Sequence, residues 1–262
     1  MSAIAALGSV ATGLSRALDA LLPAACVACG RGVDPTAPPV CVLCWHRLPE
    51  LPPPWCSRCG APRTRTVADA SPSGSDSSCA ECDEMPGLRA AAPYRLAGPA
   101  AELVRSLKYG RWVRLADPMG AAMASAARRL GGGNRPVLVP VPIAPARRRE
   151  RGFNQAEALA RGLARATGWS ILTALERSQS RGHQVGRSRG ARLQAVRGLF
   201  AVGPSVDPAA GPALLVDDVV TTGATAIACL EALEEGGFAR VGVVTFARAL
   251  RPPEESLTGK LR

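Results

Sequence analysis

The sequence has no long apolar run, few aromatic residues and almost no lysine. A membrane-spanning helix needs at least about eighteen consecutive apolar residues, and none of the 262 residues lies in such a stretch. Aromatic residues make up 4% of the chain, which leaves few rings for stacking against single-stranded nucleic acid. Of the 32 basic residues only Lys108 and Lys260 are lysines. These scarcities exclude a membrane-spanning helix and disfavour a base-stacking platform.

Positive charge is unevenly distributed along the chain. The net charge is +11, but residues 1–87 hold 6 basic and 8 acidic residues, whereas residues 88–262 hold 26 basic and 13 acidic residues. An excess of +13 in the second part favours a phosphate-rich partner, either a nucleotide or a nucleic acid. Arginine this abundant in an alanine-rich chain is also what a GC-rich genome produces, so the charge alone does not define a binding site.

The first 22 residues are predicted to form an amphipathic helix. The segment that ends at Cys26 faintly resembles a lipoprotein cleavage site, but it lacks a basic start, and Arg16 and Asp19 interrupt its apolar stretch. We therefore expect a cytoplasmic protein whose first helix docks on its own core. Binding to a membrane surface is the less favoured alternative, because the polar face carries almost no positive charge. The apolar residues that recur at helical spacing are Ile4, Leu7, Ala11, Leu14, Leu18 and Leu21.

Eight of the nine cysteines form four C-x-x-C pairs, and the pairs repeat. A glycine follows the first and third pairs, at Gly30 and Gly60, and the repeat period is 30 residues. Two such turns complete one tetrahedral zinc site. We therefore pair the first turn with the second and the third with the fourth, although an interleaved pairing stays open. The two predicted ligand sets are Cys26, Cys29, Cys41 and Cys44, and Cys56, Cys59, Cys79 and Cys82.

Zinc is the preferred ligand of these cysteines, and the predicted sites are structural. Disulfides are disfavoured in the cytoplasm, and an iron–sulfur cluster is the other alternative. Four protein ligands leave no open position on the metal, so no chemistry is expected there. Residues 69–78, rich in serine and glycine, are predicted to be a flexible insertion within the second ribbon. Cys229 stands apart and is interpreted as a small core residue.

The most informative stretch covers residues 214–226. Residues 214–216 predict a buried parallel strand, with Asp217 and Asp218 at its end. Residues 221–225, Thr-Thr-Gly-Ala-Thr, then turn the chain into a helix whose N-terminus can hold a phosphate. Two carboxylates beside a phosphate are explained if they bind sugar hydroxyls or Mg²⁺. The residues therefore predict a site for a phosphorylated sugar with a metal; the alternative is an ordinary strand–turn–helix.

The remaining elements are predicted from periodicity and from glycine and proline. Residues 88–100 are interpreted as a linker or edge strand. Helices are predicted at 103–109, 115–130 and 156–167, and strands at 137–142 and 241–246. A basic cluster at 147–151 follows a strand end, the rim where Asp217 is also expected. Residues 177–197 carry six arginines and no acid, which favours a mobile loop that closes over a pyrophosphate or follows a nucleic-acid backbone.

The stretch at 214–226 resembles the phosphoribosyl-pyrophosphate (PRPP) motif of type I phosphoribosyltransferases over its full length. The resemblance implies that Asp217 and Asp218 contact the ribose hydroxyls of Mg²⁺–PRPP. It assigns the bound 5′-phosphate and its surroundings to seven residues: Val219, Val220, Thr221, Thr222, Gly223, Ala224 and Thr225.

Taken together, the motifs resemble the ComF family of competence-related proteins. The resemblance covers about residues 18–248 and rests on the cysteine repeat, Leu107-Lys-Tyr109, residues 139–142, Arg151-Gly-Phe-Asn-Gln155 and the PRPP motif. It implies an α/β fold of the type I phosphoribosyltransferase kind, a mostly parallel sheet flanked by helices and preceded by a double zinc ribbon. Its pyrophosphate or loop candidates are Pro140, Val141, Pro142, Arg147, Arg151, Gln184 and Arg192.

Two functions are compatible with these residues. The first is a Mg²⁺-dependent phosphoribosyltransferase that displaces pyrophosphate at the ribose anomeric carbon. The second is a non-catalytic module that binds nucleic acid or protein and keeps a vestigial or sensory PRPP pocket. The resemblance further implies single-stranded DNA, and a DNA-uptake helicase or another competence protein, as partners. The predicted division is a helix at 1–22, the ribbons at 23–87, the phosphoribosyltransferase-like domain at 88–250 and a polar tail at 251–262.

Overall fold

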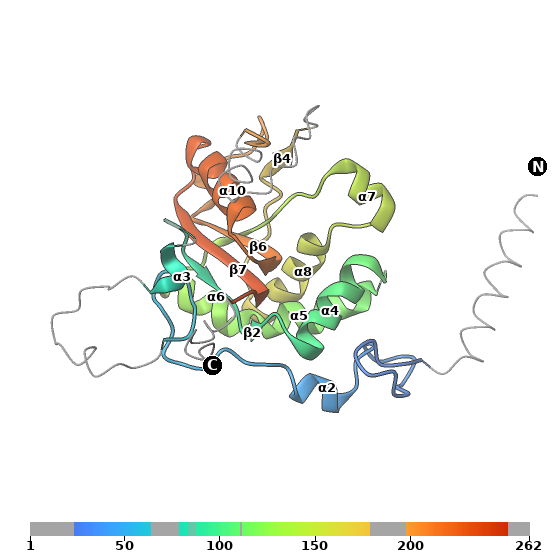
Figure 1. The fold of residues 1–262 in the computed structure, drawn as a ribbon. Helices are drawn as coiled ribbons and strands as arrows, with labels where there is room; N and C mark the ends of the chain where they lie inside the picture. Colours follow the sequence, from blue (N-terminus) through green and yellow to red (C-terminus); the bar gives the residue numbers. More distant parts are fainter. Residues whose placement is uncertain are drawn as a thin grey trace, which may run out of the picture.

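A parallel β-sheet lies between two layers of helices in the computed structural model (Figure 1). The structure describes residues 24–63, 79–83, 85, 87–110, 112–178 and 198–250. Helix α10 covers one side of the sheet, and α4, α5 and α6 lie on the other side (Figure 1). The N-terminal segment that carries α2 runs along the outside of this arrangement, away from α10 (Figure 1).

The elements follow one another in an alternating α/β order after the cysteine-rich region. The helices are α2 (Val42–His46), α3 (Ala80–Asp83), α4 (Gly98–Tyr109), α5 (Ala116–Ala122), α6 (Ala124–Gly131), α7 (Pro145–Arg151), α8 (Gln155–Thr167) and α10 (Ala224–Glu235), with 3₁₀ turns η2 (Val113–Leu115) and η3 (Pro208–Ala210). The strands are β1 (Ala90–Ala91), β2 (Tyr94–Arg95), β3 (Val137–Pro140), β4 (Leu175–Arg177), β5 (Phe200–Val202), β6 (Ala213–Val220) and β7 (Arg240–Arg248).

Strand β6 lies in the middle of the sheet. Its neighbours are β3 on one side and β7 on the other, and β1 and β2 both pair with β7, so that every pairing is parallel. Parallel strands need helices on both faces, which explains why β3, β6 and β7 are buried along almost their whole length. The short strands β4 and β5 form a separate antiparallel pair.

The two faces of the sheet support two separate apolar cores. Leu214, Val216 and Phe246 pack with α4, α5, α6 and α8 on one face. Leu215 and Val243 pack on the other face with α10, the β4–β5 pair and the second cysteine-rich segment. Because successive strand residues point to opposite faces, residues 213–216 of β6 alternate between the two cores.

The predicted architecture is confirmed: a mostly parallel sheet, flanking helices and N-terminal cysteine clusters. Strand β6, however, is longer than predicted. Asp217 and Asp218 are predicted at the strand end, but the strand runs on to Val220, and Asp217 and Val219 keep their parallel partners on β7. The acidic pair resembled a strand end because charged residues are rare in buried strands, whereas here the ladder to β7 continues past Asp217.

Other boundaries differ for local reasons. The segment 88–100, interpreted as a linker or edge strand, contains β1 at the edge of the sheet as well as β2. It also contains the start of α4, which begins at Gly98 rather than 103 because Pro99 is tolerated in a first helical turn. The predicted helix 115–130 is divided at Met123, whose N–H bonds to the Gly120 carbonyl in a tighter turn. The basic cluster forms a helix of its own, α7, and the three-residue strands β4 and β5 were not predicted.

Several predictions fall outside the described residues. These are the helix at 1–22, the insertion at 69–78, the tail at 251–262, and the loop positions Gln184 and Arg192. Within the part of the chain that the structure describes, no helix is both long and apolar enough to cross a membrane.

Candidate functional site

A small cavity opens where β6 passes into α10. Its lining comes from Asp217, residues 219–226, and Val243 and Thr245 of the neighbouring strand β7. All seven residues that the sequence assigned to the phosphate, 219–225, therefore line one cavity together with Asp217. The contribution of β7 was not predicted, because nothing in the apolar run 241–246 distinguishes Thr245 from a core residue.

Gly223 shapes the phosphate loop, which we define as residues 221–225. Its φ is +73°, a left-handed conformation that glycine adopts without strain, and it is the N-cap of α10. Helix geometry leaves the first amides of α10 without acceptors inside the helix, and no side chain caps them at Gly223. In the loop, Thr221 is exposed and Thr225 is half-buried. This combination of free amides, hydroxyls and a positive dipole end is suited to a phosphate group.

The two aspartates are divided between the two faces of the sheet. Asp217 lines the cavity with the phosphate loop. Asp218, whose side chain is 3% exposed, lies against α4, where Lys108 Nζ is 3.1 Å from its Oδ2 atom. Consecutive residues of a strand point in opposite directions, so this division follows from the extension of β6 past 216. The backbone N–H of Asp218 also donates to Asp217 Oδ1 at 2.8 Å.

The charges in this region change the protonation of Asp217. Burial raises the pKa of Asp217 to about 8, and the negative charge of Asp218 adds to the rise, while Lys108 acts against it. The aspartate pair therefore retains a proton near neutral pH unless a cation or a hydrogen-bond donor enters the cavity. Mg²⁺ or sugar hydroxyls would supply such compensation, which is the chemistry that the sequence predicted for this pair.

Arg177 adds positive charge on the α10 side of the sheet. It lies on β4, its guanidinium carbon is 5.3 Å from the Phe200 ring centre, and burial lowers its pKa, with a further contribution from the charge of Arg147. Burial raises the pKa of the Cys229 thiol, which feels both Asp217 and Arg177. Arg177 belongs to the predicted basic loop, and it lies on the same side of the sheet as Asp217.

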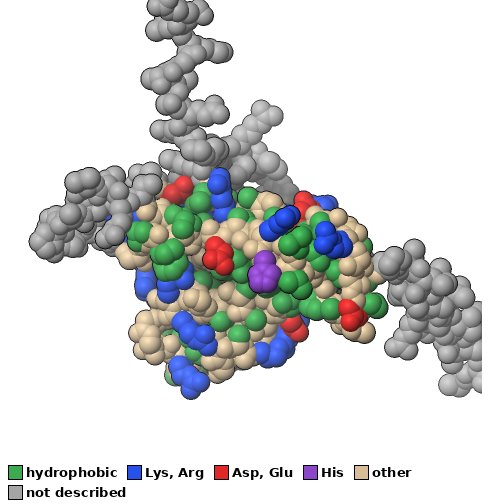
Figure 2. Space-filling model, turned by 90° about the horizontal axis from the view of Figure 1, so that it is seen from below, with side chains coloured by type: hydrophobic (Ala, Val, Ile, Leu, Met, Phe, Trp, Pro, Cys, Tyr) green, Lys and Arg blue, Asp and Glu red, His purple; other side chains and the backbone are tan. Residues whose placement is uncertain are grey.

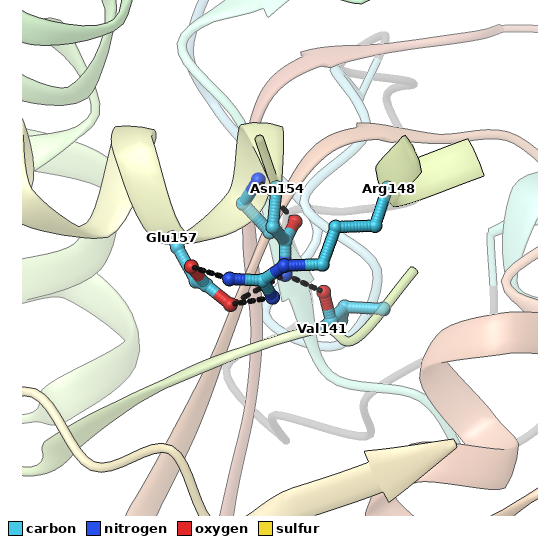
Figure 3. Close-up of polar contacts among 5 residues, drawn as sticks. Val141, Arg148, Asn154 and Glu157 are labelled. Atoms are coloured by element: carbon cyan, nitrogen blue, oxygen red, sulfur yellow. Dashed lines mark hydrogen bonds and ion pairs between the residues drawn. The ribbon is translucent and has the colours of Figure 1, made fainter. Parts of the chain in front are cut away.

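The corner between α7 and α8 is fixed by a network around Asn154 (Figure 3). The Asn154 amide donates to the Val141 carbonyl at 3.1 Å, and its oxygen caps α8 by accepting from the Ala156 N–H at 3.0 Å. Arg148 of α7 forms an ion pair with Glu157 of α8 at 2.8 Å (Figure 3). Asn154 therefore ties the start of α8 to the end of β3, which explains this part of the Arg-Gly-Phe-Asn-Gln motif structurally.

The predicted pyrophosphate candidates do not form one cluster. Pro140 and Val141 lie at the end of β3 beside β6, with the Val141 N–H 3.0 Å from the Val216 carbonyl. Arg147 is exposed on α7. Arg151 is only 6% exposed, donates to Gln155 Oε1 at 2.9 Å and lies over the Tyr109 ring, so it acts as an internal support. None of these residues, nor Pro142, lines the cavity of the phosphate loop.

Lys108 is the functional candidate that sequence reasoning left without a role. The Leu107-Lys-Tyr109 motif contributed to the family resemblance, but helical spacing gave no reason to place Lys108 beside the aspartates. A signal was present in composition, because Lys108 is one of two lysines in a chain that otherwise uses arginine. A flexible four-carbon stem that ends in a compact ammonium group can reach a buried carboxylate without a fixed planar fork.

The eight paired cysteines form two separate clusters. Cys26, Cys29, Cys41 and Cys44 make one, and Cys56, Cys59, Cys79 and Cys82 the other, with the ligand atoms of each cluster within 4.8 Å of one another. This arrangement confirms the consecutive pairing and rules out the interleaved one. Sulfur atoms around one tetrahedral zinc ion lie about 3.8 Å apart, given Zn–S bonds of about 2.3 Å. The Cys29–Cys41 separation is 3.8 Å and that of Cys56–Cys82 is 3.5 Å.

These clusters fit two structural zinc ions. Every sulfur separation quoted above far exceeds the S–S bond of about 2.05 Å in a disulfide. Each cluster offers four thiols and so leaves no open metal position for catalysis. Residues 17–84 match the family described as "Double zinc ribbon domain". The match and the geometry together establish the class of the N-terminal region as a double zinc ribbon that precedes a parallel α/β sheet.

Two curated relatives extend this class assignment. The chain is 34% identical over 116 residues to "Competence protein ComFC" of Bacillus subtilis (strain 168), a match that covers 43% of this chain and 45% of the relative. It is 34% identical over 111 residues to "Competence protein ComFC" of Streptococcus pneumoniae (strain ATCC BAA-255 / R6), covering 42% of this chain and 47% of the relative. The chain thus matches about half the length of these relatives.

The double zinc ribbon and the two ComFC matches are two separate similarities of this chain to ComF proteins. A solved structure described as "Structure of the allosteric regulatory enzyme of purine biosynthesis" is also similar, with 19% identity and a TM-score of 0.32. It covers 50% of this chain and 26% of the other. The parallel sheet itself, rather than this likeness, is the basis for the fold description above.

The raised pKa of Asp217 gives a testable effect on stability. From its ordinary pKa of 3.8 up to about 8, the folded chain holds a proton that the unfolded chain releases. Stability should therefore fall as the pH rises through this range, and Asp217→Asn, which cannot titrate, should gain stability relative to wild type. We expect the difference in the free energy of unfolding to grow by at most about 1.4 kcal/mol per pH unit.

Urea unfolding at several pH values between about 4 and about 9 measures this difference. The exposed Asp207, changed to Asn, is the matched control, since it lies outside the cavity and Asn can still cap η3. If the free energy of unfolding depended on pH in the same way in Asp217→Asn and in wild type, the raised pKa of Asp217 would be contradicted.

Proposed function

We propose that the chain binds Mg²⁺–PRPP at the carboxyl end of β6, with the 5′-phosphate on the phosphate loop. The observation that carries the proposal is the single cavity formed by Asp217 and residues 219–226. In parallel α/β sheets, ligands bind beyond the carboxyl ends of the strands, and a helix N-terminus there favours a phosphate. The proposal fits the Thr-Thr-Gly-Ala-Thr sequence of the loop as well as its geometry.

The acidic pair would serve the sugar and its metal. Asp217 faces the cavity and would accept hydrogen bonds from ribose hydroxyls or contact the Mg²⁺ ion that accompanies the pyrophosphate. Asp218 would assist from the other face, where it forms an ion pair with Lys108. When the ligand neutralises the cavity, the proton held by Asp217 would be released, so binding and deprotonation would be coupled.

The reaction that this site would support is transfer of the ribosyl group to a nucleophile. The bond between the anomeric carbon and pyrophosphate would break, the nucleophile would take the position of pyrophosphate, and Mg²⁺ would leave with the pyrophosphate. The protein would act by positioning the ribose and by offsetting charge as the leaving group departs. The exposed Arg147 and the half-buried Arg177 are the described arginines that approach each other near this region.

Isothermal titration of PRPP, with and without Mg²⁺, tests the proposal. Wild type should bind in a metal-dependent manner, and Asp217→Asn/Asp218→Asn should lose the binding because both carboxylates that serve the sugar and metal are neutralised. Asp207→Asn, the same change at an exposed site, should keep wild-type affinity. Unchanged affinity in the double variant would overturn the assignment of the site. Release of pyrophosphate in a screen of nucleophiles would then test turnover.

Binding of single-stranded DNA is a second candidate function, and the exposed arginines of α7 favour it. Arg147 and Arg149 are exposed on this short helix, and Arg148 beside them is held by Glu157. The face that carries α2 is less suitable, because its basic side chains lie scattered among apolar and acidic ones (Figure 2). We place this function in the cytoplasm, and the name of the two relatives, competence protein, agrees with a role in DNA uptake.

Salt dependence measures the DNA contact. The affinity for an oligo-dT of about 20 nucleotides should fall steeply with salt, and Arg147→Ser/Arg149→Ser should reduce the slope of log K against log salt by about 1.4. Arg161→Ser/Arg165→Ser on α8 removes the same charge from another exposed surface and should change the slope less. A flat salt response in wild type, or equal slopes in both variants, would contradict an α7 contact.

A further inference from the structure

The two zinc ribbons occupy different environments. The second ribbon is part of a core, because Cys56, Cys59 and Cys82 are buried together with Val220 and Ala226 of the candidate site. The first ribbon lies on the other face of the sheet, where Val27 and Val40 pack only partly against the α4–α8 core. Arg114 holds that ribbon by donating to the carbonyls of Pro35 and Ala37 at 2.6 and 2.7 Å.

The second ribbon is fitted to the sheet at the level of the backbone. A Cβ atom on Gly60 would lie 2.4 Å from the Ala90 carbonyl oxygen, so that only glycine allows this approach to β1. The Ala90 N–H donates to the Arg58 carbonyl at 2.8 Å. Arg248, the last residue of β7 and 1% exposed, donates to the Cys59 carbonyl and to Glu81 Oε2 at 3.2 Å. The ribbon and the sheet therefore share hydrogen bonds as well as apolar contacts.

The same ribbon touches the phosphate loop directly. Beyond Cys82 the chain turns back, with the Met85 N–H bonded to the Cys82 carbonyl at 3.0 Å. The side chains of Met85 and Leu88 are almost fully buried and lie against Gly223. A Cβ atom on Gly223 would be 2.7 Å from Leu88 Cδ2 and 3.1 Å from Met85 Sδ.

We propose that the zinc ion of the second ribbon is a positioning element of the phosphate loop. By holding Cys56, Cys59, Cys79 and Cys82 together, the metal would keep Met85 and Leu88 against Gly223. That contact would fix residues 221–225 in the conformation that presents the amides of α10. The first ribbon, on the opposite face, would have no such effect. This inference rests on the proposed function for its effect on PRPP, but the ordering of the loop itself does not depend on it.

Without a metal, the segment from Cys79 to Met85 has little stability of its own. Helix α3 spans four residues, which is far below the length at which a helix is stable alone. A structural zinc ion supplies folding free energy that four thiols cannot replace. Released from Met85 and Leu88, Gly223 would regain the wide conformational range of glycine. The phosphate would then have to order the loop on binding, and its affinity would fall accordingly.

Matched serine variants of the full chain test the proposal. Cys79 and Cys41 are each the third cysteine of their cluster, and both are half-buried. Cys79→Ser and Cys41→Ser should each lose one of the two zinc ions. Affinity for Mg²⁺–PRPP should fall at least about tenfold in Cys79→Ser, about 1.4 kcal/mol, and stay near wild type in Cys41→Ser. Cys79→His, which keeps a zinc ligand, should restore both metal and affinity. Equal effects of the two serine variants would overturn the proposal.

Hydrogen exchange separates this inference from the proposed function. Amides in residues 221–226 should exchange faster in Cys79→Ser than in wild type or Cys41→Ser, even if no protein binds PRPP. Unchanged protection of these amides would overturn the inference. Met85→Ala changes none of the eight cysteines, so it tests the same contact even if Cys79→Ser does not fold. It should retain two zinc ions yet show faster exchange in the same segment, and wild-type exchange in Met85→Ala would equally overturn the proposal.

Discussion

The position of β6 between two parallel neighbours is the constraint on which the site depends. Strand β3 pairs with β6 as far as Val216, and β7 pairs with it as far as Val220, so that residues 213–218 alternate between the two faces of the sheet. Asp217 is therefore directed to the phosphate loop and Asp218 to Lys108. A strand that ended at 216 would leave both carboxylates free to turn to one side. The ladder thus gives two adjacent acids different partners and different chemical roles.

Electrostatics explains why such a pair is kept in a sheet. Buried carboxylates are costly unless they are paired or protonated. Lys108 compensates Asp218 at 3.1 Å, whereas Asp217 retains a proton because burial raises its pKa to about 8. Protonation of Asp217 therefore lowers the cost of burying this carboxyl group in the absence of a ligand. A ligand that brings a divalent cation would favour the loss of that proton. The proposed charged sugar ligand would match these charges better than an apolar ligand would.

Sequence reasoning predicted what local patterns determine. The cysteine pairing followed from a 30-residue repeat, and helix α8 and the cores of β6 and β7 followed from apolar periodicity. It failed where tertiary contacts override local signals. The end of β6 was misplaced because two acids usually mark a boundary, and Lys108 had no local feature that pointed to Asp218. The contact of Met85 and Leu88 with Gly223 joins segments 135 or more residues apart, which no local pattern reveals.

The central claim is that the loop at the start of α10 holds the 5′-phosphate of PRPP. A crystal structure of the zinc-loaded protein with Mg²⁺ and PRPP tests it most directly. The account predicts phosphate density on the amides of residues 222–225, with the ribose beside Asp217 and Met85 still packed on Gly223. Phosphate bound elsewhere, or an empty phosphate loop in crystals that contain the ligand, would contradict the account and shift attention to the arginines of α7.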